Sequence, residues 1–232
     1  MFELDKPWKP ELNWATPAGQ LLKRFFTSLA GFPRNDLLIN VFGSAPLQMG
    51  IEESFLSNDV DIAVRVEEQS RVEDIIRDSR LGRDQTEYFI QCCPEGAFRT
   101  SLRWKDRAFH YPFSKGIARF AHPIDILIGK LNRADEKDIK AFELVMSRTG
   151  HPNEEELIAE LQAAVELFSL AHIAGFNAPS YGDNVRKIWP RLFQREIDVD
   201  AEITGPAYSR IQESYEVPKL NAELSKVRPR YQ

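Results

Sequence analysis

Two carboxylates lie one residue apart in "SNDVDIAV", residues 57–64, a stretch that is otherwise typical of a buried strand. Side chains of a strand alternate between its two faces, so Asp59 and Asp61 project together while Val60 and Ile62 point toward a core. Two like charges this close repel each other unless a cation lies between them. Mg²⁺ and Mn²⁺ bind carboxylate and phosphate oxygens, so the pair predicts a divalent-metal site. The alternative is an exposed strand end that carries two acids by chance.

A glycine-serine pair precedes these acids, in "LLINVFGSAPLQMG", residues 37–50. Gly43 follows a β-prone run, and Ser44 opens a short segment in which Pro46 suits the first turn of a helix. The exposed N–H groups of such a turn and the Ser44 hydroxyl can hold a phosphate. By itself the pair favours an ordinary strand-to-helix turn over a phosphate site. Taken together, the turn and the acids predict a triphosphate held over a metal ion.

Alternating elements must position these residues. Hydrophobic periodicity and turn signals predict an α/β protein with a mixed sheet and a helical second half. The expected helices are 17–30, 46–49, 71–81, 123–131, 136–147, 153–172, 185–194 and a segment near 208–215. The expected strands are 37–42, 60–66, 86–93 and 98–105. The polar end of the chain is not expected to adopt a fixed structure.

Composition limits the class of protein. The 232 residues are 43% hydrophobic and 28% charged with a net charge of −5, as expected for a soluble globular protein, and the N-terminus lacks a secretory pattern. We therefore expect a cytoplasmic protein without a membrane span. The two cysteines, Cys92 and Cys93, are adjacent, which favours reduced thiols. Four scattered histidines do not have the spacing of a zinc site.

Positive charge is concentrated in one region despite the acidic total. Residues 99–119 hold six basic residues and one acid, Asp106. This pattern is typical either of a solvated face on two strands or of a contact with a triphosphate or RNA.

The stretch from Val41 to Val64 resembles the signature of the DNA polymerase β-like nucleotidyltransferase superfamily, in which a glycine and a small residue precede an acid-x-acid strand. Residues 102–145 resemble the abortive-infection AbiEii-type toxin nucleotidyltransferases. The matching residues there are Trp104 and Arg107 in a tryptophan-x-x-arginine strand, the proline-led segment 123–128, Lys130-Leu131 and Lys137-Asp138. The resemblance covers roughly residues 18–148.

This resemblance implies a nucleotidyltransferase-like α/β core over residues 1–121 and a helical part over 122–232. It implies that Asp59 and Asp61 hold Mg²⁺ or Mn²⁺. Gly43, Ser44 and Lys130 would contact the phosphates of an NTP, and Asp138 would complete or orient the site.

Asp125 has two interpretations. In a strand it would be a third metal carboxylate of the wider superfamily. If Pro123 starts a helix, Asp125 lies in the first turn and complements the helix dipole. The helical periodicity through Leu131 and the family pattern favour the helix.

The expected activity is metal-dependent transfer of a nucleoside monophosphate from an NTP to a hydroxyl of RNA, such as a tRNA end, or of a protein. The resemblance also implies a toxin with an antitoxin partner. Two alternatives remain: a metal-dependent glycosyltransferase, which also uses D-x-D, and a lapsed relative that binds nucleotide or a partner without turnover.

Overall fold

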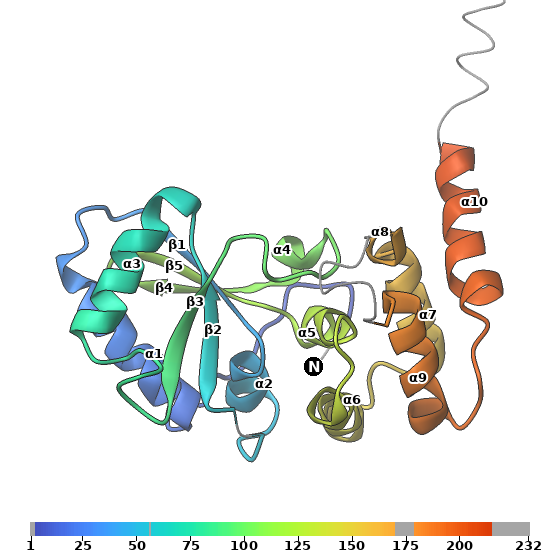
Figure 1. The fold of residues 1–232 in the computed structure, drawn as a ribbon, viewed down its shortest axis with the longest axis horizontal. Helices are drawn as coiled ribbons and strands as arrows, with labels where there is room; N and C mark the ends of the chain where they lie inside the picture. The colour runs from blue at the N-terminus through green and yellow to red at the C-terminus, as the bar shows by residue number, and fades with distance from the viewer. Residues whose placement is uncertain (1–2, 56, 170–178, 215–232) are drawn as a thin grey trace, which may run out of the picture.

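Five strands form one mixed sheet in the computed structural model, which describes residues 3–55, 57–169 and 179–214. The strand order is β3-β2-β1-β5-β4 (Figure 1). The strands are β1 Leu37–Phe42, β2 Asp59–Ala63, β3 Phe89–Cys93, β4 Phe109–Phe113 and β5 Gly116–Phe120. β1 pairs parallel with β5 and antiparallel with β2, β2 pairs parallel with β3, and β4 pairs antiparallel with β5. The predicted α/β class is confirmed.

Helices flank the sheet and make up the C-terminal half of the described chain. In the first half they are α1 Pro17–Ser28, η1 Leu29–Gly31, α2 Ala45–Gly50, α3 Val66–Asp78 and α4 Trp104–Arg107. In the second half they are α5 Pro123–Lys130, α6 Glu136–Thr149, α7 Glu154–Ala163, α8 Glu166–Ser169, α9 Tyr181–Phe193, η2 Asp200–Thr204, which is π-helical, and α10 Gly205–Ser214.

One face of the sheet is covered by α1 and α3. The Thr16 hydroxyl accepts a hydrogen bond from Gly19 N at 3.1 Å and so caps α1, which has a proline in its first turn. The apolar stripe of α1, which includes Phe25, packs with Ile39 of β1 and Ile62 of β2. This core fixes β1 and β2 side by side.

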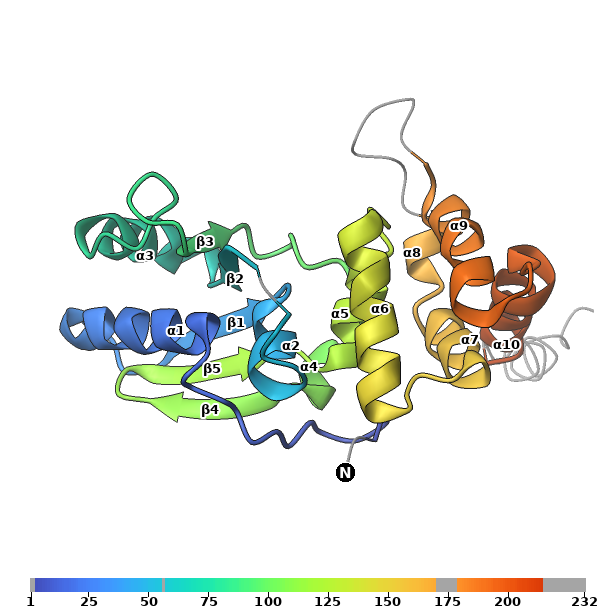
Figure 2. The ribbon, with the colours of Figure 1, turned by 90° about the horizontal axis from the view of Figure 1, so that it is seen from below.

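On the opposite face, the C-terminal ends of β1 and β2 pack against the second half of the chain. Phe42 and Ala63 share a hydrophobic cluster with α5, α6 and the later helices. Figure 2 shows α5 and α6 between the sheet and the group formed by α7 to α10. The core therefore continues from the sheet into the helical region.

Helix α9 holds the C-terminal end of α5 in place. Its Tyr181 hydroxyl donates to the carbonyl of Ile128 and its Asn184 amide donates to the carbonyl of Leu131, both at 2.9 Å. The last carbonyls of a helix have no partner within the helix, so these bonds satisfy them. They also fix the direction in which α5 ends, and Lys130 is its last residue.

The predicted strand over 98–105 is wrong. Residues 97–103 form an irregular loop, and Trp104–Arg107 is the short helix α4. Thr100 and Ser101 are buried, and the Thr100 hydroxyl donates to the carbonyl of Asp125 at 2.6 Å, so contacts with α5 override the β propensity of this segment. The tryptophan-x-x-arginine motif consequently lies on a helix.

Other boundaries differ less. The helix expected over 71–81 begins at Val66, where the preceding strand was expected to end, and the helix expected at 185 begins at Tyr181. The helix expected over 153–172 is interrupted after Ala163 and resumes as α8 to Ser169. Residues 170–172, Tyr215 and the polar end lie outside the described residues. In the part of the chain that is described, no helix is both long enough and apolar enough to cross a bilayer.

Candidate active site

A cavity of about 320 Å³ lies where β1 and β2 meet α5 and α6. All six residues assigned to the site from the sequence line it, namely Gly43, Ser44, Asp59, Asp61, Lys130 and Asp138. They come from three elements, β2, α5 and α6, and from the turn between β1 and α2, and they are separated by up to 95 positions in the chain, from Gly43 to Asp138. Concave sites that gather polar groups from distant segments are the usual setting for ligand binding.

The turn after β1 brings the backbone against the carboxylate pair. Gly43 has φ +67°, a conformation that side-chain-bearing residues rarely adopt. A Cβ atom at Gly43 would lie 2.1 Å from Oδ2 of Asp61, so the position requires glycine for space as well. Ser44 follows as the N-cap of α2, but its side chain makes no capping hydrogen bond, which leaves the hydroxyl to the cavity it lines.

Asp61 is a half-buried acid. Burial, together with the negative charge of Asp59, raises the pKa of Asp61 to about 6. A hydrogen bond from the Cys93 thiol, with Sγ 3.8 Å from Oδ1, and the positive charge of Lys130 and Lys137 oppose this rise. A bound cation would stabilise the ionised form of Asp61, because the cation offsets both its burial and its repulsion by Asp59.

Asp59 is oriented by a chain of hydrogen bonds from α6. The Ser57 hydroxyl donates to Oδ1 of Asp59 at 2.5 Å, and Nζ of Lys137 donates to the Ser57 hydroxyl at 3.1 Å. The second carboxylate oxygen, Oδ2, takes no part in this chain. Helix α6 is thus linked to β2 through the metal-binding carboxylate that the sequence predicts.

Asp138 lies under the cations of the cavity. Its carboxylate accepts hydrogen bonds from Lys130 Nζ at 2.9 Å and from the Arg133 guanidinium at 2.9 and 3.0 Å. Burial favours the neutral form, but these bonds outweigh it and keep the pKa of Asp138 below its usual value. Asp138 also closes a capping box with Asp135 at the start of α6. The Asp138 side chain is only 1% exposed. Its main role is therefore to orient Lys130 and Arg133, and it is poorly placed to contact a ligand itself.

The first turn of helix α5 carries Asp125, as the helical interpretation predicts, and Asp125 does not line the cavity. Both of its oxygens accept hydrogen bonds from Arg107, at 2.6 and 3.2 Å, and Arg107 also pairs with Glu160 at 2.6 Å. Asp125 is 0% exposed. The structure places it in a buried ion pair and does not bring it to Asp59 and Asp61.

Metal binding at this site would rest on two acids. Within the described ranges, no group of three or more histidine, cysteine, aspartate or glutamate side chains is arranged to hold a metal ion. Two carboxylates suit Mg²⁺, which keeps several waters and binds through one or two carboxylates together with substrate phosphates. Asp59 and Asp61 therefore fit a partly hydrated Mg²⁺ ion that also binds substrate phosphates. They do not fit an ion whose ligands all come from the protein.

Several cavity residues were not assigned to the site from the sequence. Lys137, Arg133 and Arg99 add three cations to Lys130, and Asn132 and Phe98 complete the wall. Lys137 belongs to the lysine-aspartate pair that the resemblance includes, and Arg99 belongs to the basic region of residues 99–119. Arg133 and Asn132 follow the end of α5 in a polar loop, where the residue types carry no signal of a site.

Comparisons of the chain with models of protein families, with curated proteins and with solved structures find no match. The fold is that of an α/β protein with a five-stranded mixed sheet, flanking helices and a helical C-terminal region.

Proposed function

We propose that this protein is a metal-dependent nucleotidyltransferase that moves a nucleoside monophosphate from an NTP to an acceptor hydroxyl. One observation carries the proposal: Asp59 and Asp61 share a single cavity with the Gly43-Ser44 turn and Lys130. Acids, a glycine turn and cations converge there from both halves of the chain. This arrangement supplies the two things that a triphosphate substrate needs, which are a seat for its metal ion and groups that bind its negative charge.

Each group has a role in the proposed reaction. The acceptor hydroxyl releases its proton to water and its oxygen bonds to the α-phosphorus, while the bond from that phosphorus to its bridging oxygen breaks and pyrophosphate leaves with the bonding electrons. Ser44 and the turn hold the triphosphate, and Lys130 and Arg133, fixed by Asp138, face the charge that collects on the leaving pyrophosphate. A divalent ion held by Asp59 and Asp61 would supply Lewis-acid stabilisation of the phosphate oxygens.

The transfer is tested with α-labelled forms of each of the four NTPs, together with Mg²⁺, total RNA and a protein mixture. We expect label in one acceptor class and release of pyrophosphate. Asp61→Asn should reduce both by about 100-fold or more, because the seat of the metal is lost. Asp36→Asn is the matched control, since Asp36 is an exposed carboxylate that pairs with Arg34.

The same preparation separates the alternatives. A protein that binds Mg²⁺-NTP but releases no pyrophosphate with any acceptor is a lapsed relative. A protein that binds nucleotide sugars in preference to NTPs contradicts the proposal in favour of a glycosyltransferase. A role as the toxin of a toxin-antitoxin pair rests on the family resemblance alone.

A further inference from the structure

The four cations that line the cavity differ in the partners they already have. Lys130 Nζ lies 2.9 Å from the carboxylate of Asp138, and the Arg133 guanidinium lies 2.9 Å from the same carboxylate. Neither Lys137 nor Arg99 has a carboxylate at ion-pair distance among the residues that the structure describes. The protein itself therefore offsets much of the positive charge of Lys130 and Arg133 but not that of Lys137 and Arg99.

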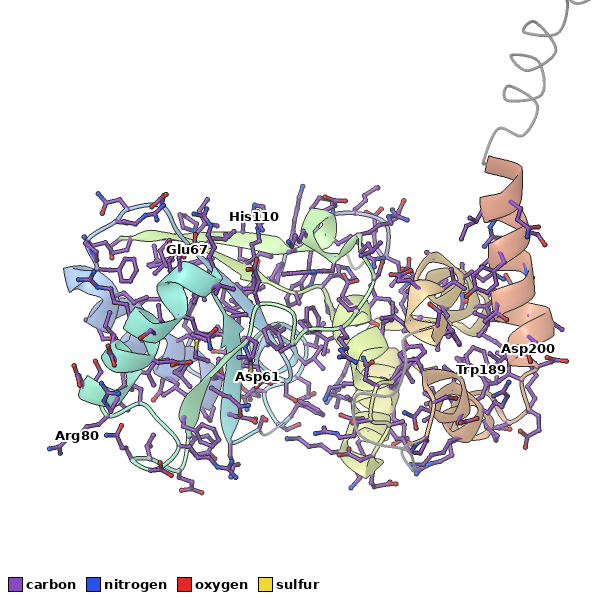
Figure 3. All side chains as sticks on the ribbon, turned by 45° about the horizontal axis from the view of Figure 1, so that its top comes forward. Asp61, Glu67, Arg80, His110, Trp189 and Asp200 are labelled. Atoms are coloured by element: carbon purple, nitrogen blue, oxygen red, sulfur yellow. The ribbon has the colours of Figure 1, made fainter. Side chains whose placement is uncertain are left out.

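Lys137 lies beside the carboxylate pair. Its Nζ donates to the Ser57 hydroxyl at 3.1 Å, and that hydroxyl donates to Oδ1 of Asp59 at 2.5 Å, so one hydroxyl group separates the ammonium from Asp59. The positive charge of Lys137 also opposes the rise in the pKa of Asp61, which lies on the side of the sheet that adjoins the second half of the chain (Figure 3). Both acids are therefore close enough to sense the charge of Lys137.

The Lys137 ammonium has donors that no protein group uses. An ammonium carries three N–H donors, and the neutral Ser57 hydroxyl accepts one of them. In the part of the chain that is described, no other acceptor lies at hydrogen-bond distance from this Nζ. The side chain is exposed and lines the cavity, so an anion that enters the cavity can reach the remaining donors. Hydrogen bonds from an ammonium to a phosphate oxygen are roughly twice as strong as those between neutral groups.

The charge of Lys137 acts in opposite directions on two kinds of ligand. It repels a divalent cation held by Asp59 and Asp61, whereas it attracts a triphosphate. A triphosphate that binds the cation supplies negative charge between the two and removes the repulsion. The two ligands are thereby coupled, and the coupling free energy is the same whichever of them binds first.

The alternative is a structural lysine that links α6 to β2 through Ser57. Loss of such a link would leave Asp59 poorly oriented and would weaken the binding of metal and nucleotide together. Loss of a phosphate-binding lysine would instead change the two affinities in opposite directions. Because the Lys137 side chain is exposed, its replacement is compatible with a folded protein.

We propose that the Lys137 ammonium binds a phosphate oxygen of the nucleotide and thereby makes binding of the divalent ion depend on the nucleotide. This inference rests on the proposed function, because it requires a triphosphate in the cavity. Without a ligand the ammonium is held by Ser57, and with a nucleotide bound its free donors bind phosphate. Lys137 thus has a role separate from that of Lys130 and Arg133, which share the charge of Asp138.

Isothermal titration calorimetry at constant ionic strength measures the two affinities separately. The first titration uses Mg²⁺ alone, and the second uses the α,β-methylene analogues of the four NTPs in saturating Mg²⁺, in which a carbon replaces the oxygen whose bond would break. Lys137→Met should lower the Kd for Mg²⁺ alone by about twofold or more, because a like charge is removed. It should raise the Kd for the tightest-binding analogue by about tenfold or more, because a charged hydrogen bond is lost.

Two further variants and one further ligand define the contact. Lys140→Met is the matched control, because Lys140 is an exposed lysine of the same helix that does not line the cavity, and it should change either Kd by less than about twofold. Lys137→Arg keeps the charge and should restore nucleotide affinity to within about threefold of the wild type. Inorganic tripolyphosphate with Mg²⁺ should lose affinity for Lys137→Met as the nucleotide does, because the contact is with phosphate and not with the base.

The proposal is overturned if Lys137→Met weakens both affinities, since a structural link predicts that result. It is also overturned if nucleotide affinity stays unchanged, if Lys140→Met loses as much, or if the loss does not extend to tripolyphosphate. A Lys137→Met protein that fails to fold, as judged by its thermal unfolding curve, counts against it as well, because the lysine would then be structural.

These measurements keep the inference apart from the proposed function. If the wild type binds Mg²⁺-NTP and releases pyrophosphate while Lys137→Met binds nucleotide equally well, only the present inference fails. If the wild type binds no NTP in the presence of Mg²⁺, the proposed function fails whatever the titration with Mg²⁺ alone shows.

Discussion

Gly43 shows how one residue can determine whether a site exists. Its positive φ and its contact with Asp61 leave no room for a side chain. The backbone of the turn therefore lies as close to Asp61 as the proposed phosphate binding requires. The sequence singled out Gly43 by residue type. Why the position requires glycine, namely its proximity to Asp61, is visible only once β1 and β2 are paired.

Replacing this glycine should disable the site without unfolding the protein. Gly43→Ala must move either the turn or Asp61, and a displacement of about 1 Å is enough to reduce transfer by about 100-fold. The measurement is the rate of pyrophosphate release beside the Mg²⁺ affinity. Gly96→Ala is the control, because a Cβ at Gly96 meets no atom within 4 Å. Equal rates for the two variants would contradict the close approach seen here.

The elevated pKa of Asp61 has a consequence for stability without metal. The folded protein retains the Asp61 proton up to about pH 6, while the unfolded chain releases it near pH 4, so stability falls as the pH rises between these values. At pH 7.5 the loss is on the order of 3 kcal/mol. In EDTA, Asp61→Asn should therefore raise the midpoint of thermal unfolding by roughly 6–12 °C at pH 7.5 and by much less at pH 4.

Saturating Mg²⁺ should cancel this advantage, because it stabilises the wild type by binding Asp61 and does not stabilise Asp61→Asn to the same extent. Mg²⁺ affinity of the wild type should also weaken below pH 6, where protons compete for the carboxylate. An affinity that is constant from pH 5 to pH 8 would contradict a role for Asp61 as a ligand.

At the scale of elements, Arg107 connects α4 to α5 and α7. It pairs with Asp125 in the first turn of α5 and with Glu160 of α7, and its side chain is only 2% exposed. The sequence placed Asp125 correctly in a helix but could not show its partner, because Arg107 was expected on a strand. The buried pair holds the start of the helix that ends at Lys130.

Breaking this pair should cost stability and leave metal binding intact. Asp125→Ala leaves Glu160 as the one acidic partner of the buried Arg107 among the described residues, which we expect to lower the free energy of unfolding by about 3–5 kcal/mol. Asp36→Ala, which breaks the exposed pair with Arg34, should change the free energy of unfolding far less, because solvent screens an exposed pair. Urea unfolding measures both. If Asp125→Ala also abolishes Mg²⁺ binding while the protein stays folded, Asp125 belongs to the metal site after all.

Helix and strand patterns predicted most of the elements, and the errors have a common cause. The hairpin of β4 and β5 was not predicted, because "FHYPF" contains Pro112, which is tolerated at an edge strand where its missing N–H needs no partner. The neighbouring residues 98–105 have β propensity but are held by contacts with α5. In both cases long-range packing decided the structure, and a sequence alone does not display it.

At the scale of the whole molecule, one cavity joins two halves that share a core. The cluster around α5 and α6 includes Phe42, Leu47 and Ala63 from the sheet half. The six residues that the sequence assigned to the site were found together because each belongs to a short motif. Lys137 and Arg133 were not found because their roles depend on α6 and the end of α5 lying beside β2.

The shared core predicts that the sheet half is not independent. A fragment of residues 1–121 would expose Phe42, Leu47 and Ala63, which the later helices cover, and it would lose α5 and α6 from the cavity. We expect this fragment to aggregate or to show little chemical-shift dispersion in an NMR spectrum, whereas residues 1–232 fold. A well-dispersed spectrum that also responds to Mg²⁺ would contradict this expectation.

Asp138 has two roles, so finding it in a protein of the same fold does not by itself show that the protein carries out the proposed reaction. One carboxyl group both starts a long helix and steadies two cations, so a lineage that abandons catalysis still has reason to keep it. Asp61 on β2 has no comparable structural role, whereas Asp59 accepts the Ser57 hydrogen bond that links β2 to α6. In a relative that has lost the proposed transfer, we therefore expect Asp61 to be substituted first, and the presence of Asp138 alone does not indicate activity.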